Sequence, residues 1–83
     1  MKLTIRYFAS IREALGATET IEVPAGTTVG AVRDVLIARS GRHAEVLARG
    51  RALRCALNQV LCVEPALIEA DAELAFFPPV TGG

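Results

Sequence analysis

Apolar and polar residues alternate at the beginning of the chain, and this pattern predicts a β-strand over residues 2–8. Leu3, Ile5 and Tyr7 fall on one face of that strand, which should point into the core. Phe8 does not fit the alternation, because it is a large apolar residue on the face that is left to solvent. The first strand therefore ends on an exposed aromatic residue.

A helical spacing of apolar residues predicts the main helix in the middle of the chain. Thr27 or Thr28 can cap its start with a side-chain oxygen, and Gly41 is a suitable residue to end it. The stripe expected to be buried consists of Val29, Val32, Val35 and Leu36.

Two shorter helices are predicted on either side of the main one. The run Ser10-Ile11-Arg12-Glu13 has the spacing of a capping box, and Gly16 can close the helix that it opens. A second short helix is expected around residues 44–48, ending at Gly50.

Four further strands are predicted, at residues 20–23, 53–57, 60–64 and 73–77. Pro24-Ala25-Gly26 breaks the first of them after the inward residues Ile21 and Val23. A tight turn at Asn58-Gln59 joins the next two, and Pro65 ends that hairpin. This order of elements predicts an α+β domain in which one main helix covers one face of a single sheet.

The tight turn also sets the register of the hairpin. It places Leu57 opposite Val60, Ala56 opposite Leu61, and Cys55 opposite Cys62. The first and last of these pairs should face the helix, and Ala56 and Leu61 should point outward with Arg54 and Val63. In the last strand the same alternation turns Leu74 and Phe76 inward and Phe77 outward.

Three strands thus each place one large apolar residue on the open face of the sheet: Phe8, Leu61 and Phe77. Scattered surface hydrophobic residues are normal and need no functional explanation. If the three strands are neighbours, however, the residues form one patch, which is typical of a protein interface. Periodicity leaves both interpretations open.

Composition and charge exclude several classes of function. Eighty-three residues suffice for one small domain, and about half of them are apolar, unlike a disordered chain. Nine basic residues balance nine acidic ones, so nucleic acid and anionic membranes are not expected partners. Met1-Lys2 leads directly into a strand, and no apolar run has membrane-spanning length, so a cytoplasmic protein is predicted.

No residue pattern predicts catalysis or a metal site. His43 is the only histidine, and a structural or solvated role is expected for it. The acids follow no spacing that pairs them for general acid–base work. Cys55 and Cys62 are too far apart for a Cys-x-x-Cys metal pair and are expected to be buried structural thiols. As cross-strand neighbours they can in principle be bridged or relay sulfur, although a reducing cytosol argues against a disulfide.

The last six residues are Pro78, Pro79, Val80, Thr81, Gly82 and Gly83. The prolines favour an extended exit from the sheet, and six extended residues reach roughly 20 Å. Two glycines without Cβ atoms can pass through a narrow channel and leave the terminal carboxyl carbon open to a reagent. A frayed chain end is the alternative. Bulky apolar residues and a Pro-Pro spacer precede the two terminal glycines, and this arrangement favours a functional tail over a frayed end.

Three segments carry a resemblance to a known family. They are Phe76-Phe77-Pro78-Pro79-Val80-Thr81-Gly82-Gly83; Tyr7-Phe8-Ala9 followed by Ile11-Arg12-Glu13 and Gly16; and Ala56-Leu57-Asn58-Gln59. In these segments the chain resembles the small, sulfur-carrying subunits of molybdopterin synthase, which belong to the MoaD/ThiS-like, ubiquitin-related proteins. The similarity extends over essentially the whole chain.

The resemblance implies a ubiquitin-like β-grasp fold, with the first and last strands parallel and adjacent at the centre of the sheet. It implies a domain at residues 1–77 and an extended tail at residues 78–83. It also implies that Phe8, Leu61 and Phe77 are buried against a larger catalytic subunit, whose pocket receives Pro78, Pro79, Val80, Thr81 and Gly82. The family forms a heterotetramer, with two small subunits at opposite ends of a large-subunit dimer.

The chemistry that the resemblance implies takes place at Gly83. An E1-like adenylyltransferase would activate its carboxylate with ATP and Mg²⁺, and sulfur supplied through a sulfurtransferase would convert it to a thiocarboxylate. The thiocarboxylate would then donate sulfur to cyclic pyranopterin monophosphate in molybdopterin synthesis. No tightly bound cofactor is expected on this chain. The alternatives are a related β-grasp carrier for thiamine or cysteine synthesis, a ubiquitin-like modifier of other proteins, and a plain interaction module.

Overall fold

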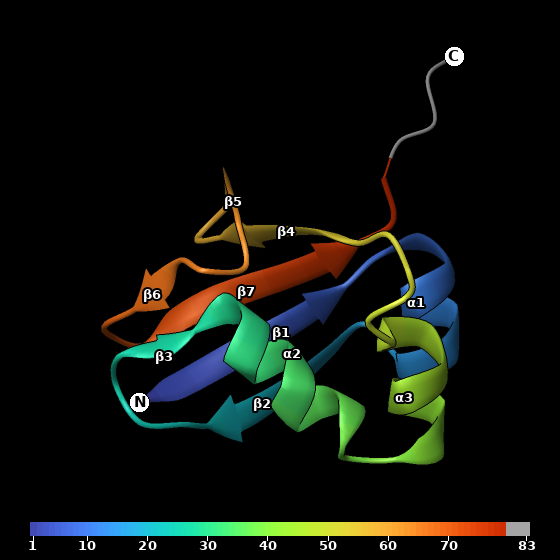
Figure 1. The fold of residues 1–83 in the computed structure, drawn as a ribbon, viewed down its shortest axis with the longest axis horizontal. Coiled ribbons are helices and arrows are strands. Elements are labelled where there is room, and N and C mark those ends of the chain that lie inside the picture. Colours follow the sequence, from blue (N-terminus) through green and yellow to red (C-terminus); the bar gives the residue numbers. More distant parts are fainter. Residues whose placement is uncertain (80–83) are drawn as a thin grey trace.

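Five strands form one mixed sheet in the order β2-β1-β7-β4-β5 (Figure 1). The computed structural model describes residues 1–79 of the chain. The strands of this sheet are β1 (Lys2–Tyr7), β2 (Thr18–Glu22), β4 (Arg54–Leu57), β5 (Val60–Cys62) and β7 (Ala72–Phe77). A separate pair, which sequence periodicity missed, joins β3 (Thr27–Thr28) to β6 (Leu67–Ile68).

The first and last strands lie side by side within the sheet and run parallel. The other neighbouring strands in the sheet are antiparallel. Three helices, α1 (Ala9–Leu15), α2 (Val29–Ile37) and α3 (Gly41–Leu47), complete the described part of the chain. This arrangement confirms the predicted α+β class and the ubiquitin-like β-grasp topology.

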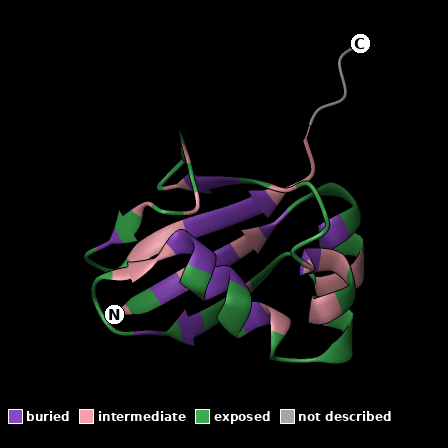
Figure 2. Cartoon of the chain, viewed as in Figure 1, coloured by how far each residue is buried: buried purple, intermediate pink, exposed green. Residues whose placement is uncertain are grey.

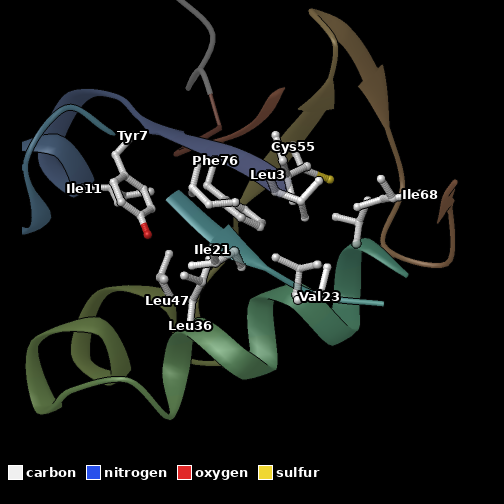
Figure 3. Packing of buried hydrophobic residues seen from close by; sticks show 14 residues of the cluster. Leu3, Tyr7, Ile11, Ile21, Val23, Leu36, Leu47, Cys55, Ile68 and Phe76 are labelled. Carbon is white, nitrogen blue, oxygen red and sulfur yellow. The ribbon is translucent and has the colours of Figure 1, made fainter. Parts of the chain in front are cut away.

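The hydrophobic core fills the space between the sheet and the helices. Figure 3 shows Leu3, Tyr7, Ile21, Leu36, Leu47 and Phe76 converging there from strands and helices. Figure 2 shows buried segments on β1, β7 and α2, where the two layers meet. The predicted inward positions Leu3, Ile5, Tyr7, Ile21, Val23, Leu74 and Phe76 are all buried.

The hairpin turn confirms the predicted register, with Cys55 opposite Cys62, Ala56 opposite Leu61, and Leu57 opposite Val60. Asn58 and Gln59 both have positive φ, at 49° and 68°. Two consecutive residues of this kind match the right-handed twist of a two-residue hairpin. Val60 is nevertheless 68% exposed, because β5 is the edge strand of the sheet and the helix layer does not cover this residue.

The start of α1 differs from the predicted capping box. The helix begins at Ala9, the capping position is taken by Phe8 without a side-chain hydrogen bond, and Ser10 lies inside the first turn. Ala9 has φ 53°, in the left-handed region, so the chain reverses sharply between β1 and α1. Gly16 ends the helix as predicted, with φ 92°.

The buried stripe of α2 also differs from the prediction at one position. Val35 is 46% exposed, whereas Arg33 is only 3% exposed. The true stripe of Val29, Val32, Arg33 and Leu36 follows the i, i+3, i+4, i+7 spacing, and the charge of Arg33 concealed it. Thr28 caps α2, since its Oγ accepts a hydrogen bond from the Ala31 N–H.

Gly41 was predicted to end the main helix. In the structure it instead begins α3. The main helix stops at Ile37 with Ala38 at its C-cap. Ser40 caps α3 through a hydrogen bond from the His43 N–H, so the expected helix at residues 44–48 starts earlier. Over residues 1–79, no helix combines the length and apolar character that crossing a bilayer requires.

Candidate docking face and tail base

The face of the sheet opposite the helices carries one continuous row of side chains. Strand pairing sets Arg6 beside Ala75, Ala75 beside Ala56, and Ala56 beside Leu61, across β1, β7, β4 and β5. The two residues in the middle of the row are alanines, whose side chains project little from the sheet. Larger side chains at either end and in the next row then stand above them.

A hollow of about 500 Å³ results from this contrast in side-chain size. Ala56 and Ala75 line it together with Phe8 and Phe77. The two phenyl rings meet edge to face, with 6.4 Å between their centroids and planes at 88°. A pair in this arrangement is held by ring electrostatics as well as by burial, so the two rings support each other.

Charged groups surround the apolar centre of the hollow. The Arg6 guanidinium carbon lies 5.3 Å from the centroid of the Phe8 ring, within the range of a cation–π contact. Arg6 also pairs with Glu73 at 3.6 Å, and Gln59 completes the lining. An apolar centre with a polar rim is the usual anatomy of a protein interface.

The structure brings two of the three predicted interface residues into contact and places the third nearby. Phe8 and Phe77 touch, whereas Leu61 lies beyond Ala56 on the edge strand β5. Leu61 is 66% exposed. The condition of the patch hypothesis is met for Phe8 and Phe77, because β1 and β7 are neighbours, whereas β4 separates β7 from the strand of Leu61, and Leu61 does not line the hollow.

The tail leaves the sheet at the end of β7, directly after Phe77. Pro78 lies against a second hollow, lined by α1, α3 and the loop that leads from α3 to β4. Pro79 is half-buried. The predicted tail residues Val80, Thr81, Gly82 and Gly83 lie outside the described residues.

Arg33 fixes the loop that lines this second hollow. Its guanidinium donates hydrogen bonds to the carbonyl oxygens of Leu47, Ala48 and Arg51 at 2.8, 2.5 and 3.1 Å. It also pairs with Glu64 at 2.9 Å. Sequence reasoning missed this role, because an arginine inside an amphipathic helix is normally on the solvent side.

Arg49 extends the same ionic network. It pairs with Glu64 and, at 2.9 Å, with Asp34, and it donates to the Gly30 carbonyl oxygen at 2.9 Å. The hydrogen bond from Arg49 holds the pKa of Asp34 below its usual range. The network therefore ties α2 to the chain on both sides of β4 and β5.

A second polar cluster surrounds Glu19 and ties β2 to α3. Its Oε2 accepts hydrogen bonds from the Tyr7 hydroxyl and His43 Nε2, both at 2.7 Å, and Arg39 lies 3.2 Å from Oε1. Burial raises the pKa of Glu19, but the hydrogen bonds from Tyr7 and His43 and the charge of Arg39 outweigh it, so the pKa lies below its usual value. Burial and the bond to Glu19 raise the pKa of Tyr7.

His43 also lies 2.7 Å from the Ser40 hydroxyl, so a serine, a histidine and a glutamate are in line. Ser40 Oγ is already engaged as the cap of α3, and Glu19 is shared with Tyr7 and Arg39. These bonds connect elements of the fold, in agreement with the structural role predicted for His43. The sequence around His43 did not reveal its partner Glu19, which lies 24 positions away.

The two thiols face each other across the hairpin. Cys55 is buried as predicted, but Cys62 is half-buried because it lies on the edge strand. Burial, and then the hydrogen bond with Cys62, raise the pKa of Cys55 to about 12. Within residues 1–79, no group of three or more His, Cys, Asp or Glu side chains is placed to hold a metal ion.

Comparison with known proteins identifies the family. The model of the ThiS family matches residues 5–83. The chain belongs to the ThiS family. Among curated proteins, it is 39% identical over 82 residues to the molybdopterin synthase sulfur carrier subunit of Escherichia coli K12, covering 98% of this chain and 99% of that one.

Solved structures of this ThiS-family fold agree with the topology. The small archaeal modifier protein 1 of Haloferax volcanii superposes with a TM-score of 0.75 at 26% identity, covering 95% of this chain and 98% of that one. A chain from the complex of subunits 1 and 2 of the molybdopterin-converting factor of Helicobacter pylori gives a TM-score of 0.67 at 23% identity, with both chains fully covered. The second similarity, at this identity, supports the fold alone.

Proposed function

We propose that this chain is the sulfur-carrier subunit of a molybdopterin synthase. The observation that carries the proposal is its 39% identity to the sulfur carrier subunit of E. coli over nearly the whole length of both chains. The open-face hollow and the Gly82-Gly83 ending are in keeping with it, because a carrier needs a surface to dock and a reactive end to deliver.

We assign different roles to the two parts of the chain. Residues 1–77 form the β-grasp domain that docks, and residues 78–83 form the tail that enters the partner's pocket. Pro78 and Pro79 give the tail a stiff base, since proline fixes φ. Val80, Thr81 and Gly82 form its shaft, and Gly83 presents the terminal carboxyl group.

The chemistry at Gly83 requires activation, because a carboxylate is a poor electrophile. An E1-like adenylyltransferase joins the carboxylate to AMP and releases pyrophosphate from ATP·Mg²⁺. A persulfide from a sulfurtransferase displaces AMP to give an acyl disulfide, which a second thiol cleaves to release the thiocarboxylate. In the large subunit this thiocarboxylate donates its sulfur to cyclic pyranopterin monophosphate. The partners supply the catalytic groups, and no tightly bound cofactor is needed on this chain.

The large subunit is proposed to dock on the open face. Phe8 and Phe77 present a supported aromatic pair, and Leu61 extends the apolar surface across β4 to β5. Aromatic residues at the centre of such a surface commonly carry most of the binding energy. We propose the heterotetramer of the family, a cytoplasmic location, and no nucleic-acid or membrane partner, in keeping with the balanced charge.

Intact mass spectrometry tests the function. The protein is incubated with the adenylyltransferase, ATP·Mg²⁺ and a persulfide sulfur source, and its mass should rise by the exchange of one oxygen for one sulfur. A variant lacking Gly83, or extended by one residue, should stay at its original mass while its thermal unfolding is unchanged. Absence of the sulfur-containing product under conditions that adenylate the chain would refute the proposal.

A second test addresses docking. The double variant Phe8→Asp/Leu61→Asp should fold but lose binding to the large subunit by at least about 100-fold, because hot-spot truncations cost ~2 kcal/mol or more each. Val35→Asp is the matched control, since Val35 is an exposed apolar residue on the helix layer. Equal binding by the double variant and the control would show that the open face is not the docking surface.

A protein modifier is the second candidate, and the similarity to small archaeal modifier protein 1 favours it. A modifier would appear as conjugates of Gly83 with lysines of other proteins in the same adenylation assay. A carrier for thiamine or cysteine synthesis would gain sulfur but would not transfer it to the pterin in the presence of the large subunit.

A further inference from the structure

Cys55 and Cys62 are directly opposite each other in the antiparallel β4–β5 pair. Their sulfur atoms are 3.5 Å apart, within reach of a hydrogen bond from the Cys62 thiol to Cys55 Sγ. The Cys55 thiol in turn donates to the Cys62 carbonyl oxygen at 3.3 Å. In Figure 3, Cys55 lies between Phe76 and Ile68, away from Tyr7 and Ile11. Two thiols thus meet at the margin of the core, where one of them is partly open to solvent.

We propose that Cys55 and Cys62 form a dithiol modification site, which closes to a reversible intrachain disulfide when the protein meets a small-molecule disulfide such as glutathione disulfide. The proposal does not depend on the sulfur-carrier function, because it concerns side chains within the domain and not Gly83.

The backbone already meets the requirement of a disulfide. Residues directly opposite in an antiparallel pair have Cα atoms about 4.5–5.5 Å apart, inside the range of about 4.4–6.8 Å that disulfides span. The sulfur atoms lie 3.5 Å apart and must approach to about 2.05 Å for the bond to form. The two-residue turn at Asn58-Gln59 holds the register that keeps them opposed.

The difference in exposure assigns an order to the two thiols. Cys62 is the accessible one, so its thiolate attacks a sulfur of glutathione disulfide, breaking that bond and releasing one glutathione thiolate. Cys55 then loses its proton and attacks the Cys62 sulfur, and the second glutathione leaves. Two protons and two electrons pass from the protein to the oxidant, which becomes two glutathione molecules. Proximity suits Cys55 to the second step, because the target sulfur is already beside it. Burial raises the pKa of Cys55 and so makes this step slower than the first.

Closing the disulfide should stiffen the part of the sheet next to the tail. Cys55 also pairs with Phe76 on β7, and its neighbour Arg54 pairs with Phe77. The disulfide would therefore stiffen the β4–β5 hairpin, which carries Leu61. This hairpin pairs with β7, the strand that leads into the tail. A cross-link around this short loop should raise Tm by roughly 10–20 °C, since it removes freedom from the unfolded chain.

The test compares the full-length protein with a variant of identical composition. In Cys62→Val/Val63→Cys the second thiol moves by one residue, to the exposed position just past the end of β5, and no longer lies opposite Cys55. Both proteins are incubated across a series of glutathione to glutathione disulfide ratios, quenched with an alkylating agent and weighed intact. Cys62→Ser serves as a second variant should the exchanged pair fold poorly.

The wild type should lose two hydrogen atoms, resist alkylation at both cysteines and unfold at higher temperature, and dithiothreitol should reverse all three changes. The exchanged variant should instead carry a stable glutathione adduct with no rise in Tm. The proposal is overturned if the wild type accumulates a glutathione adduct or keeps two alkylatable thiols at every ratio. It is equally overturned if its oxidised form unfolds at or below the temperature of the reduced form.

Discussion

Arg33 offers the sharpest test of how the fold holds the base of the tail. Replacing it with methionine keeps the length and apolar stem of the side chain but removes every donor. We expect Arg33→Met to lower the free energy of unfolding by about 3–5 kcal/mol, the range found when one partner of a buried charged network is removed. Such a loss would be a large fraction of the total, which is about 4–12 kcal/mol for a chain of this length.

The magnitude follows from the contacts that methionine cannot make. Three carbonyl oxygens, of Leu47, Ala48 and Arg51, lose a charged donor, and each such bond contributes about 1.5–3 kcal/mol. The sum overestimates the effect, because the loop can turn some carbonyls to water and methionine still fills the core. Glu64 loses one partner but keeps Arg49, so it adds little. These corrections bring the expected loss into the stated range.

Urea unfolding followed by far-ultraviolet circular dichroism measures this loss, since the chain has no tryptophan and only one tyrosine. Arg54→Met is the matched control, because Arg54 is exposed and its loss should change stability by no more than about 0.5 kcal/mol. Arg33→Lys should fall between them, since lysine keeps the charge but lacks the planar fork. If Arg33→Met and Arg54→Met unfold within about 1 kcal/mol of each other at equal m-value, the network does not support the loop as argued.

Two further predictions concern Glu19 on β2 and Ala9 at the start of α1. Glu19→Gln should flatten the fall in stability with acid: the pKa of Glu19 is lowered in the folded state, so its contribution is present above its unfolded pKa near 4.5 and is lost as pH falls through the folded value. Thermal unfolding between pH 7 and about pH 3 checks this, and parallel profiles for the two proteins would contradict it. Ala9→Gly should leave stability unchanged or raise it by up to about 1 kcal/mol, because Ala9 has φ 53°, whereas Ala14→Gly inside α1 should lower it by about 1 kcal/mol. Urea unfolding of both variants decides the matter, and equal losses would show that Ala9 is not strained.

Local signals in the sequence were sufficient for much of the fold. Alternation identified the inward residues of β1 and β7, and the Asn58-Gln59 turn specified the pairing of Cys55 with Cys62. These predictions succeed because period and turn geometry act over a few residues. The predicted helix ends were less accurate. Ser10 and Gly41 have residue types typical of caps, but neither occupies the predicted capping position.

Contacts between distant segments explain what the sequence concealed. Arg33 is buried because carbonyl oxygens 14–18 positions away converge on its guanidinium. Glu19 meets His43 across 24 positions, and the β3–β6 pair joins residues about 40 positions apart. The residues next to a polar side chain in the sequence do not reveal partners this far away. The local pattern therefore predicts that the side chain is exposed.

The open face illustrates why large residues alone do not specify a docking site. Periodicity identified Phe8, Leu61 and Phe77, but a hollow also needs small residues between large ones. Ala56 and Ala75 become its floor only because β4 pairs with β7 in the register that sets them side by side. The parallel pairing of β1 with β7, a contact between the two ends of the domain, sets Arg6 on the other side of Ala75. The shape of the open face is therefore a property of the topology, and the same five strands in another order would scatter these residues.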